Sequence, residues 1–189
     1  MKRPDRRLQR TLLPIAFWWM AAYIVRLAHA DAPVIDIAVL AHEGAPKCLE
    51  QWGPTASYLN QQIPEYAFKI LPLEYDQIKD AANRHLASFY LVNPAQYVML
   101  EKTYDAQRIV TLREKTINGV STLYGGVIFC REERTDIHSL NDIRYKHFRA
   151  VDADSLGGWL AALRELKATG INIPKELASL TYAKTHEQV

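Results

Sequence analysis

Apolar, β-branched runs alternate with helical periodicity between residues 34 and 112, and this alternation is the strongest constraint on the fold. Strands are predicted at residues 34–40, 66–73, 85–92 and 108–112. Helices are predicted between them, through Leu49, Trp52, Ala56 and Leu59, at residues 76–84, and from Asn93-Pro94 onward. Such alternation predicts a largely parallel sheet with helices on both faces, and the strands are apolar on both sides as that arrangement requires. The predicted fold class is therefore α/β.

The pattern changes at the polar stretch 115–122, where we expect the chain to cross into a second lobe. A strand is predicted at 124–129, and the pair Gly125-Gly126 at its start suits a bend or the close approach of another backbone. The expected lobes are residues 31–122 and 123–189. The second is predicted to contain a helical turn at 139–142, strands at 147–151 and 180–182, a helix from Ser155 to Gly170, and the start of a helix at 185–187.

The first thirty residues have the three parts of a secretory signal. A basic head precedes an apolar run from Leu12 to Val25, and the small-x-small sequence Ala28-His29-Ala30 suits signal peptidase. The alternative is a retained membrane anchor, although the run is shorter than the ~20 residues that span a bilayer. Either reading places the remainder outside the cytoplasm, and cleavage makes it periplasmic.

Charge excludes one class of partner. Six of the 23 basic residues, but only one of the 21 acidic residues, lie before residue 31. The remainder carries 17 basic and 20 acidic residues, a net charge of −3 with histidine neutral. We therefore expect no nucleic-acid partner, which would require a basic face.

The chain contains two cysteines, Cys48 and Cys130. An even count in an oxidising compartment permits a disulfide, and two free buried thiols are the alternative. No Cys-x-x-Cys or His-x-x-x-His spacing accompanies them, so no metal and no other cofactor is expected.

The clearest candidate binding element is Ser155-Leu156-Gly157-Gly158, which follows a predicted strand and opens a helix. Backbone N–H groups at the positive end of a helix bind anions, and the Ser155 hydroxyl can also donate. The alternative is ordinary N-capping by Ser155.

Other candidates follow strands or begin helices. Asn93 and Tyr97 lie where open α/β sheets hold ligands, with a helix cap and a buried aromatic side chain as the alternative. His42 follows the first strand and His186 begins the last segment, and each alone is more typical of an ordinary loop or surface residue. The sequence contains no catalytic signature, so binding is favoured over enzymatic turnover.

The chain resembles the phosphate/phosphonate-type periplasmic substrate-binding proteins, and most closely the variant that serves as extracellular sensor of certain histidine kinases, including tetrathionate sensors. The resemblance covers residues 34–189 and is carried by an ordered set of stretches: Ile37–Leu40, Trp52–Leu59, Pro72–Asp76, Val92-Asn93-Pro94 with Tyr97, Gly125–Phe129 and Ser155–Trp159.

The resemblance implies a type II periplasmic-binding fold with two lobes, mixed or parallel sheets and a ligand in the cleft between them. The family's anion-binding serine corresponds to Ser155, its cleft histidine to His186, and its first-lobe aromatic residue to Tyr75, with Asn93 and Tyr97 as the helix-start pair. The implied function is binding of a small anion, with a histidine kinase as partner. The alternative is the solute-binding component of an importer with an ABC permease as partner.

Two departures from the family pattern modify these expectations. Leu156 and Gly157 replace the hydroxyl residues that usually follow the serine. Two side-chain donors are therefore lost, and backbone N–H groups must supply more of the hydrogen bonds to the anion. A sulfur oxyanion fits such a site better than a phosphonate. Family members also continue beyond the position of Val189. The resemblance therefore implies an incomplete second lobe that lacks strands and leaves apolar surface exposed.

Overall fold

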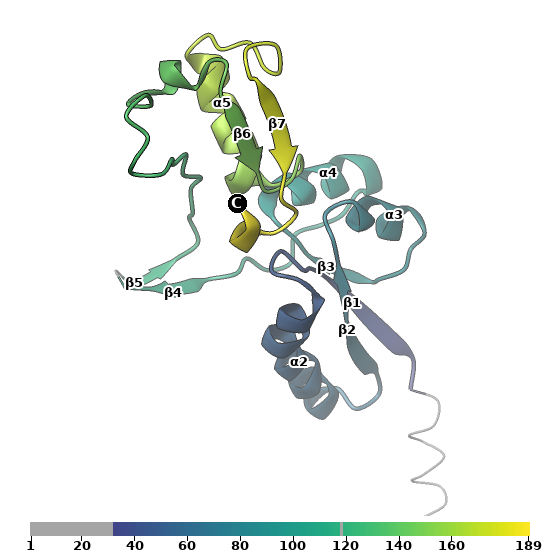
Figure 1. The fold of residues 1–189 in the computed structure, drawn as a ribbon. Helices are drawn as coiled ribbons and strands as arrows, with labels where there is room; N and C mark the ends of the chain where they lie inside the picture. Colours follow the sequence, from purple (N-terminus) through teal and green to yellow (C-terminus); the bar gives the residue numbers. More distant parts are fainter. Residues whose placement is uncertain (1–31, 118) are drawn as a thin grey trace, which may run out of the picture.

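The computed structural model describes residues 32–117 and 119–189. The predicted secretory signal lies outside the described residues. The first lobe is built on a parallel sheet of order β2-β1-β3, with β1 (Val34–Leu40) at its centre (Figure 1). Its partners are β2 (Ala67–Leu73) and the short β3 (Phe89–Leu91). The predicted parallel α/β arrangement is confirmed.

Helices cover both faces of this sheet because β1 is apolar on both sides. On one face, α2 (Ala45–Gln62) buries Cys48 and Trp52 against Val39. On the other, Ala38 and Leu40 join a core formed with α3 (Gln77–Asn83) and α4 (Pro94–Tyr104). Alternate residues of one strand therefore supply two separate cores.

The second lobe has its own small parallel sheet, formed by β6 (His147–Ala150) and β7 (Ser179–Tyr182). The helix after β6 opens with five π-helical residues, Leu156–Leu160, and continues as α5 (Ala161–Ala168). Its core contains four buried apolar residues: Ile143, Leu166, Ile171 and Leu177. Gly170 follows α5 with a φ of +78°, the left-handed conformation expected at a helix end.

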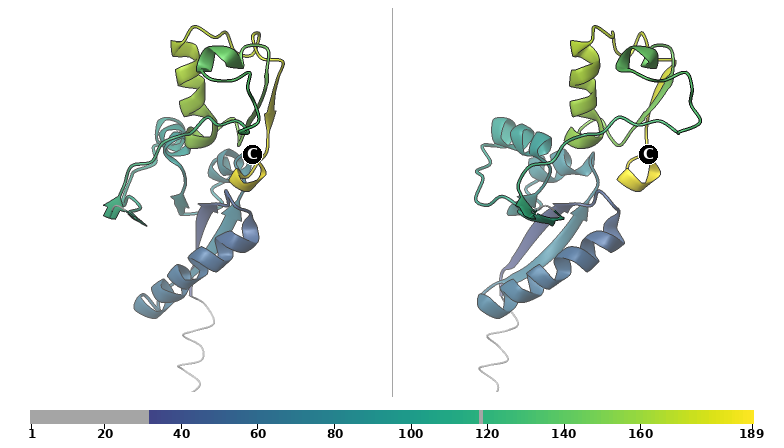
Figure 2. Two further views of the ribbon diagram at one scale, coloured as in Figure 1. Left: turned by 60° about the vertical axis from the view of Figure 1, so that its left-hand side comes forward. Right: turned by 90° about the vertical axis from the view of Figure 1, so that its left-hand side faces the viewer.

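The smaller elements of this lobe also match the sequence. The helical turns predicted at 139–142 and 185–187 appear as two short 3-10 helices, η1 (Leu140–Ile143) and η3 (His186–Gln188). The two lobes share apolar contacts, because Val151, directly after β6, packs into the first lobe's core. The second lobe stands above the first, with α5 and β7 on top and α2 below (Figure 2).

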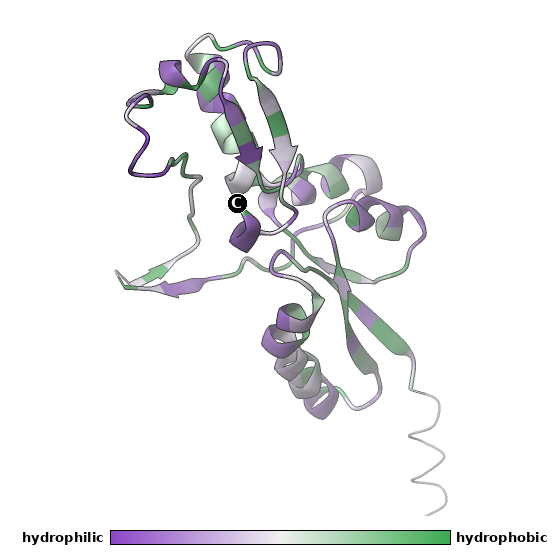
Figure 3. Ribbon diagram, viewed as in Figure 1, coloured by the Kyte–Doolittle hydropathy of each residue, from purple (hydrophilic) through white to green (hydrophobic). Residues whose placement is uncertain are grey.

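Two predicted strands are wrong. Residues 108–112 and 124–129 are extended but belong to no strand, and a hairpin of β4 (Glu114–Thr116) and β5 (Gly119–Ser121) lies between them. Most of their apolar side chains are exposed, with Ile109 at 72% and Phe129 at 71%, whereas Ile128 is half-buried against the second lobe's core. A strand needs a neighbouring edge for its hydrogen bonds, and no described strand pairs with either segment. Residues 108–130, which include the hairpin, are called the connecting arm. Figure 3 shows apolar colour in parts of this connecting arm as well as in the sheets.

The glycine pair in the arm behaves as predicted. A methyl group on Gly126 would lie 2.4 Å from the carbonyl oxygen of Gly157, so glycine is needed for the two backbones to meet. The close approach joins the arm to the start of the π-helical turn.

The two cysteines are free thiols in this structure. Cys48 lies on the face of α2 that packs against β1, where burial raises its pKa. Cys130 is exposed in the arm, so the alternative of two free buried thiols is correct for Cys48 and wrong for the burial of Cys130. The possible Cys48–Cys130 disulfide is not formed in this structure.

Candidate functional site

Ser155 caps the helix that follows β6. Its side chain is 2% exposed, and its Oγ accepts a hydrogen bond from the Gly158 N–H at 3.1 Å. Its carbonyl oxygen accepts from the N–H groups of Trp159 and Leu160, both at 3.0 Å. Capping, the alternative interpretation of this serine, is therefore present in the structure.

Two of the three predicted anion-binding amides remain. Among the described residues, no acceptor takes the N–H groups of Leu156 or Gly157, while Gly158 is used by the cap. Helix starts leave such groups unpaired, and they carry the positive end of the helix dipole. This turn therefore retains two donors for a negatively charged group.

Tyr75, from the first lobe, reaches the same turn. Its hydroxyl donates to Ser155 Oγ at 3.4 Å, and the side chain is buried directly after β2. Burial raises the pKa of the Tyr75 phenol, and the nearby charge of Asp152 raises it further. The phenol stays protonated at neutral pH and so remains a donor.

Asn93 connects the lobes at the start of α4. Its Oδ1 accepts from the N–H groups of Ala95 and Gln96 at 2.9 and 3.0 Å, which is the predicted helix cap. Its Nδ2 donates to the Asp154 carbonyl oxygen of the second lobe at 3.2 Å. One side chain thus closes a helix and bridges the lobes.

These two roles can be separated by mutation. We expect Asn93→Ala to lower the free energy of unfolding by about 1–2 kcal/mol, because both the cap and the bridge are lost. Asn93→Asp keeps the cap acceptor and removes only the donor to Asp154, so its loss is expected to be the smaller one. Urea denaturation measures the loss in free energy of unfolding for each variant. Equal losses would show that the bridge to Asp154 accounts for the whole effect and that the cap adds nothing to it.

Tyr97 is placed differently from the prediction. Its hydroxyl bonds to Glu101 one turn later on α4, and the side chain is half-buried. The preceding residue, Gln96, is 2% exposed, and its Nε2 donates to the Tyr75 carbonyl oxygen at 3.3 Å while its Oε1 is buried without a partner. The sequence analysis missed Gln96, although its four-residue spacing from the buried Leu100 indicates an inward face.

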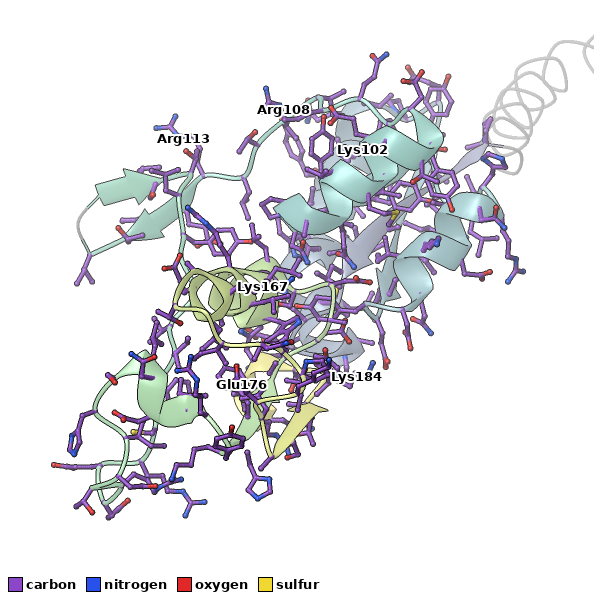
Figure 4. All side chains as sticks on the ribbon, turned by 90° about the horizontal axis from the view of Figure 1, so that it is seen from above. Lys102, Arg108, Arg113, Lys167, Glu176 and Lys184 are labelled. Atoms are coloured by element: carbon purple, nitrogen blue, oxygen red, sulfur yellow. The ribbon has the colours of Figure 1, made fainter. Side chains whose placement is uncertain are left out.

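The sequence analysis also missed a buried carboxylate. Asp152 is buried, accepts from the Asp154 N–H at 3.0 Å and pairs with Lys184 Nζ at 3.0 Å. The hydrogen bond that Lys184 donates to Asp152 raises the pKa of Lys184, which lies just after β7 (Figure 4). Because Lys184 compensates this carboxylate, the donors beside it can still attract an anion.

An aromatic ring limits the space over the turn. A methyl group on Gly157 would lie 3.0 Å from Cε2 of Tyr124 in the arm. The ring therefore lies beside the turn that carries the unpaired N–H groups, and a side chain at Gly157 would require the exposed Tyr124 ring to shift. Tyr124 is a further residue of the site that the sequence analysis did not select.

His42 and His186 lie together. Their ring centroids are 5.9 Å apart and the rings meet at 87°. His42 and Glu43 also line a shallow pocket at the end of β1 with Lys47 and Trp52. Burial lowers the pKa of His186, the neighbouring His42 lowers it further, and Glu43 opposes both.

Neither a candidate metal site nor a membrane-spanning helix occurs in residues 32–117 and 119–189. No group of three or more His, Cys, Asp or Glu side chains in this part of the chain could hold a metal ion. Likewise, none of its helices combines the length and apolarity that crossing a membrane requires.

Known proteins share both sequence and fold with this chain. Over 137 residues, 72% of this chain, it is 32% identical to the tetrathionate sensor histidine kinase of Salmonella typhimurium, and the match spans 23% of that kinase. A crystal structure of a binding protein component of an ABC phosphonate transporter from Pseudomonas aeruginosa matches with a TM-score of 0.61 and 17% identity. That match covers 83% of this chain and 52% of the other, and at this identity it demonstrates the fold alone.

A family model confirms the resemblance seen in the sequence. The model described as "ABC transporter, phosphonate, periplasmic substrate-binding protein" matches residues 37–189, which include both lobes and the turn led by Ser155. A family of this kind binds a substrate outside the cytoplasm and does not define an enzyme. The chain therefore belongs to the phosphonate-type periplasmic substrate-binding protein family.

Proposed function

We propose that this chain is an extracytoplasmic binding module for a small oxyanion and acts as the sensor part of a two-component histidine kinase. The observation that carries the proposal is the pair of unpaired N–H groups at Leu156 and Gly157, beside the hydroxyl of Tyr75 from the other lobe. Donors from both lobes converge on one turn. A ligand that contacts both lobes stabilises their closed arrangement by its higher affinity for that state.

The donor set also favours one class of anion. The two N–H groups and the phenol are neutral donors, and Asp152 is already compensated by Lys184. A site with only a few neutral donors suits a weakly hydrated ion, because such an ion loses little hydration free energy on leaving water. A sulfur oxyanion fits this description better than a phosphonate, in line with the sensor relative named for tetrathionate.

The site residues of this proposal are fewer than those selected from the sequence. Ser155 positions the turn, Leu156 and Gly157 bind through their backbones, and Tyr75 donates from the first lobe. The Gly158 N–H and the Tyr97 hydroxyl are held by hydrogen bonds of 3.1 and 2.5 Å to Ser155 and Glu101, so they are not included. The Tyr75 hydroxyl is included because its own bond, to Ser155 Oγ, is long at 3.4 Å and can be replaced by a bond to a ligand. A direct contact of His42 or His186 with the ligand stays a prediction, as does the lobe boundary between residues 122 and 123.

A second role, as solute-binding component of an ABC importer, is favoured by the family description and by the solved relative. The two roles predict different neighbours. A histidine kinase encoded next to this chain supports the sensor, whereas permease genes support the importer. Both roles need export, which we attribute to residues 1–30 as a cleaved signal or, alternatively, an anchor, and N-terminal sequencing of the periplasmic protein distinguishes the two.

Thermal melting of the full chain with sulfate, phosphate, thiosulfate and tetrathionate tests the binding proposal. An anion at 100 times its dissociation constant adds about 2.7 kcal/mol to the native state and so raises the melting temperature by several degrees. We expect Ser155→Ala to lower the unliganded stability by about 1 kcal/mol through loss of the cap, and to abolish the rise. A rise with none of the four anions contradicts the proposal.

The matched control is Ser57→Ala, on the exposed side of α2, where the serine bonds only to the Gly53 carbonyl oxygen. This variant is expected to keep the full anion-dependent rise. If Ser155→Ala keeps the rise as well, the turn at Ser155 is not the binding site.

A further inference from the structure

The end of the second lobe docks on the first lobe through a compact set of side chains. The turn η3 places His186 edge-to-face against His42, which follows β1, with ring centroids 5.9 Å apart. Beside the rings, Glu187 of η3 pairs with Lys47 of α2 at 2.5 Å. Figures 1 and 2 show this turn above the ends of β1 and α2.

The charges around the two rings come from both lobes. Lys47 also pairs with Glu43 at 3.3 Å, and Glu43 Oε1 lies 3.6 Å from Nε2 of His42. One carboxylate, Glu43, therefore faces both histidines but is shared with a lysine. Two further charges lie at η3: Glu187, whose partner is the same lysine, and Arg149 of β6, whose Nε donates to the Gln188 carbonyl oxygen at 2.9 Å.

We propose that His42 and His186 form a pH-sensitive latch between the lobes, closed while the His186 ring is neutral and released when it gains a proton. The neutral His186 ring packs edge-to-face on His42, as aromatic rings prefer, whereas a charged imidazolium at this contact gives up part of its hydration. Glu43 can compensate that charge only by weakening its pair with Lys47. The latch acts without a ligand and so does not rest on the proposed oxyanion site.

The direction of the pH effect follows from the histidine that is buried. Docking lowers the pKa of His186 below its value in an undocked turn, because burial and His42 both disfavour the charged ring. A group of this kind stabilises the docked state fully above its ordinary pKa of about 6.5. That stability is lost as the pH falls below this value, so acid opens the latch.

A second titration reinforces the same direction at lower pH. The hydrogen bond from Lys47 lowers the pKa of Glu187, so this carboxylate stabilises docking above its ordinary pKa and less as the pH falls below it. The histidine step and the carboxylate step therefore occur in different pH ranges, and the histidine step can be measured alone.

Thermal melting of the full chain without added anion, between about pH 7.5 and about pH 5.5, tests the latch across the histidine titration range. We expect the wild type to lose about 3 °C over this range, since a small free-energy change shifts the melting of a domain of this size by a few degrees. His186→Gln keeps a polar side chain that cannot gain a proton in this range, and is expected to remove most of the loss. His42→Gln is expected to reduce it partly.

Controls and a local readout make the result specific. His147→Gln is the matched control, because this exposed histidine bonds to Ser179 on the neighbouring strand β7 and should leave the wild-type slope unchanged. Hydrogen exchange, corrected for intrinsic rates, is expected to rise together in residues 41–48 and 184–189 of the wild type on acidification. A wild-type slope retained in His186→Gln, or exchange that rises in neither segment, overturns the latch.

Discussion

Replacing Gly158 with alanine is expected to lower the free energy of unfolding by about 3 kcal/mol, the upper part of the range for forced overpacking. The added methyl group would lie 2.3 Å from Cγ2 and 2.5 Å from Cβ of Val151, and 2.8 Å from Oγ of Ser155. Val151 is held in the first lobe's core and Ser155 caps the helix, so neither can move without further loss. Urea denaturation measures the change.

Gly53→Ala is the matched control for this experiment. Gly53 lies inside α2, and a methyl group there meets nothing within 4 Å. Alanine is the better helix former by about 1 kcal/mol, but Gly53 precedes Pro54, whose ring disfavours a helical residue with a Cβ before it, so this variant is expected to stay within about 1 kcal/mol of the wild type. A Gly158→Ala protein as stable as the wild type would show that the turn can move away from Val151. The two donors of the site, the N–H groups of Leu156 and Gly157, would then move with the turn.

The second large effect is expected in the core of the second lobe. Leu166 on α5 has 0% exposure and packs with Ile143, Ile171 and Leu177. Leu166→Ala removes this contact and leaves a cavity, which costs about 3 kcal/mol in typical cores. The lobe has few other buried apolar residues, so we expect its melting to move further than that of the first lobe.

Leu123→Ala provides the comparison, because the same deletion is made at a side chain that is 86% exposed. Its effect is expected to stay within about 0.5 kcal/mol, as for most surface changes. Hydrogen exchange followed in urea can report α5 and β1 separately. Equal losses in the two variants would show that the core around Leu166 contributes little to stability.

Features that short-range chemistry decides were predicted correctly from the sequence. The β-branched run of β1 and the Asn93-Pro94 start of α4 were predicted because apolar pattern and capping are properties of a few neighbouring residues. The cap at Ser155 and the close approach of Gly126 belong to the same class. Each can be recognised without knowing what lies across the fold.

The failures are all contacts between distant parts of the chain. Residues 108–112 and 124–129 have strand-like composition, but a strand forms only where another edge accepts its hydrogen bonds. A disulfide between Cys48 and Cys130 requires two residues that are distant in sequence to meet in space, and the structure instead leaves both thiols free.

The candidate site was predicted in its parts and not in its geometry. Ser155 and Tyr75 were both selected, and the structure brings them within 3.4 Å. On α4, however, the selected residue, Tyr97, bonds to Glu101, and the residue buried near Tyr75 is the preceding one, Gln96. Successive helical residues point about 100° apart, so only packing against the sheet decides which one faces the site.

By itself the sequence determined the parallel α/β character, most helix and strand positions and the turn that begins at Ser155, because these follow from apolar periodicity and local backbone hydrogen bonding. Only the tertiary structure decided which donors stay unpaired, that Asp152 is compensated by Lys184, and that His42 meets His186. Those outcomes depend on residues that are close in space but far apart in sequence, and pattern along the chain carries no information about which distant groups will meet.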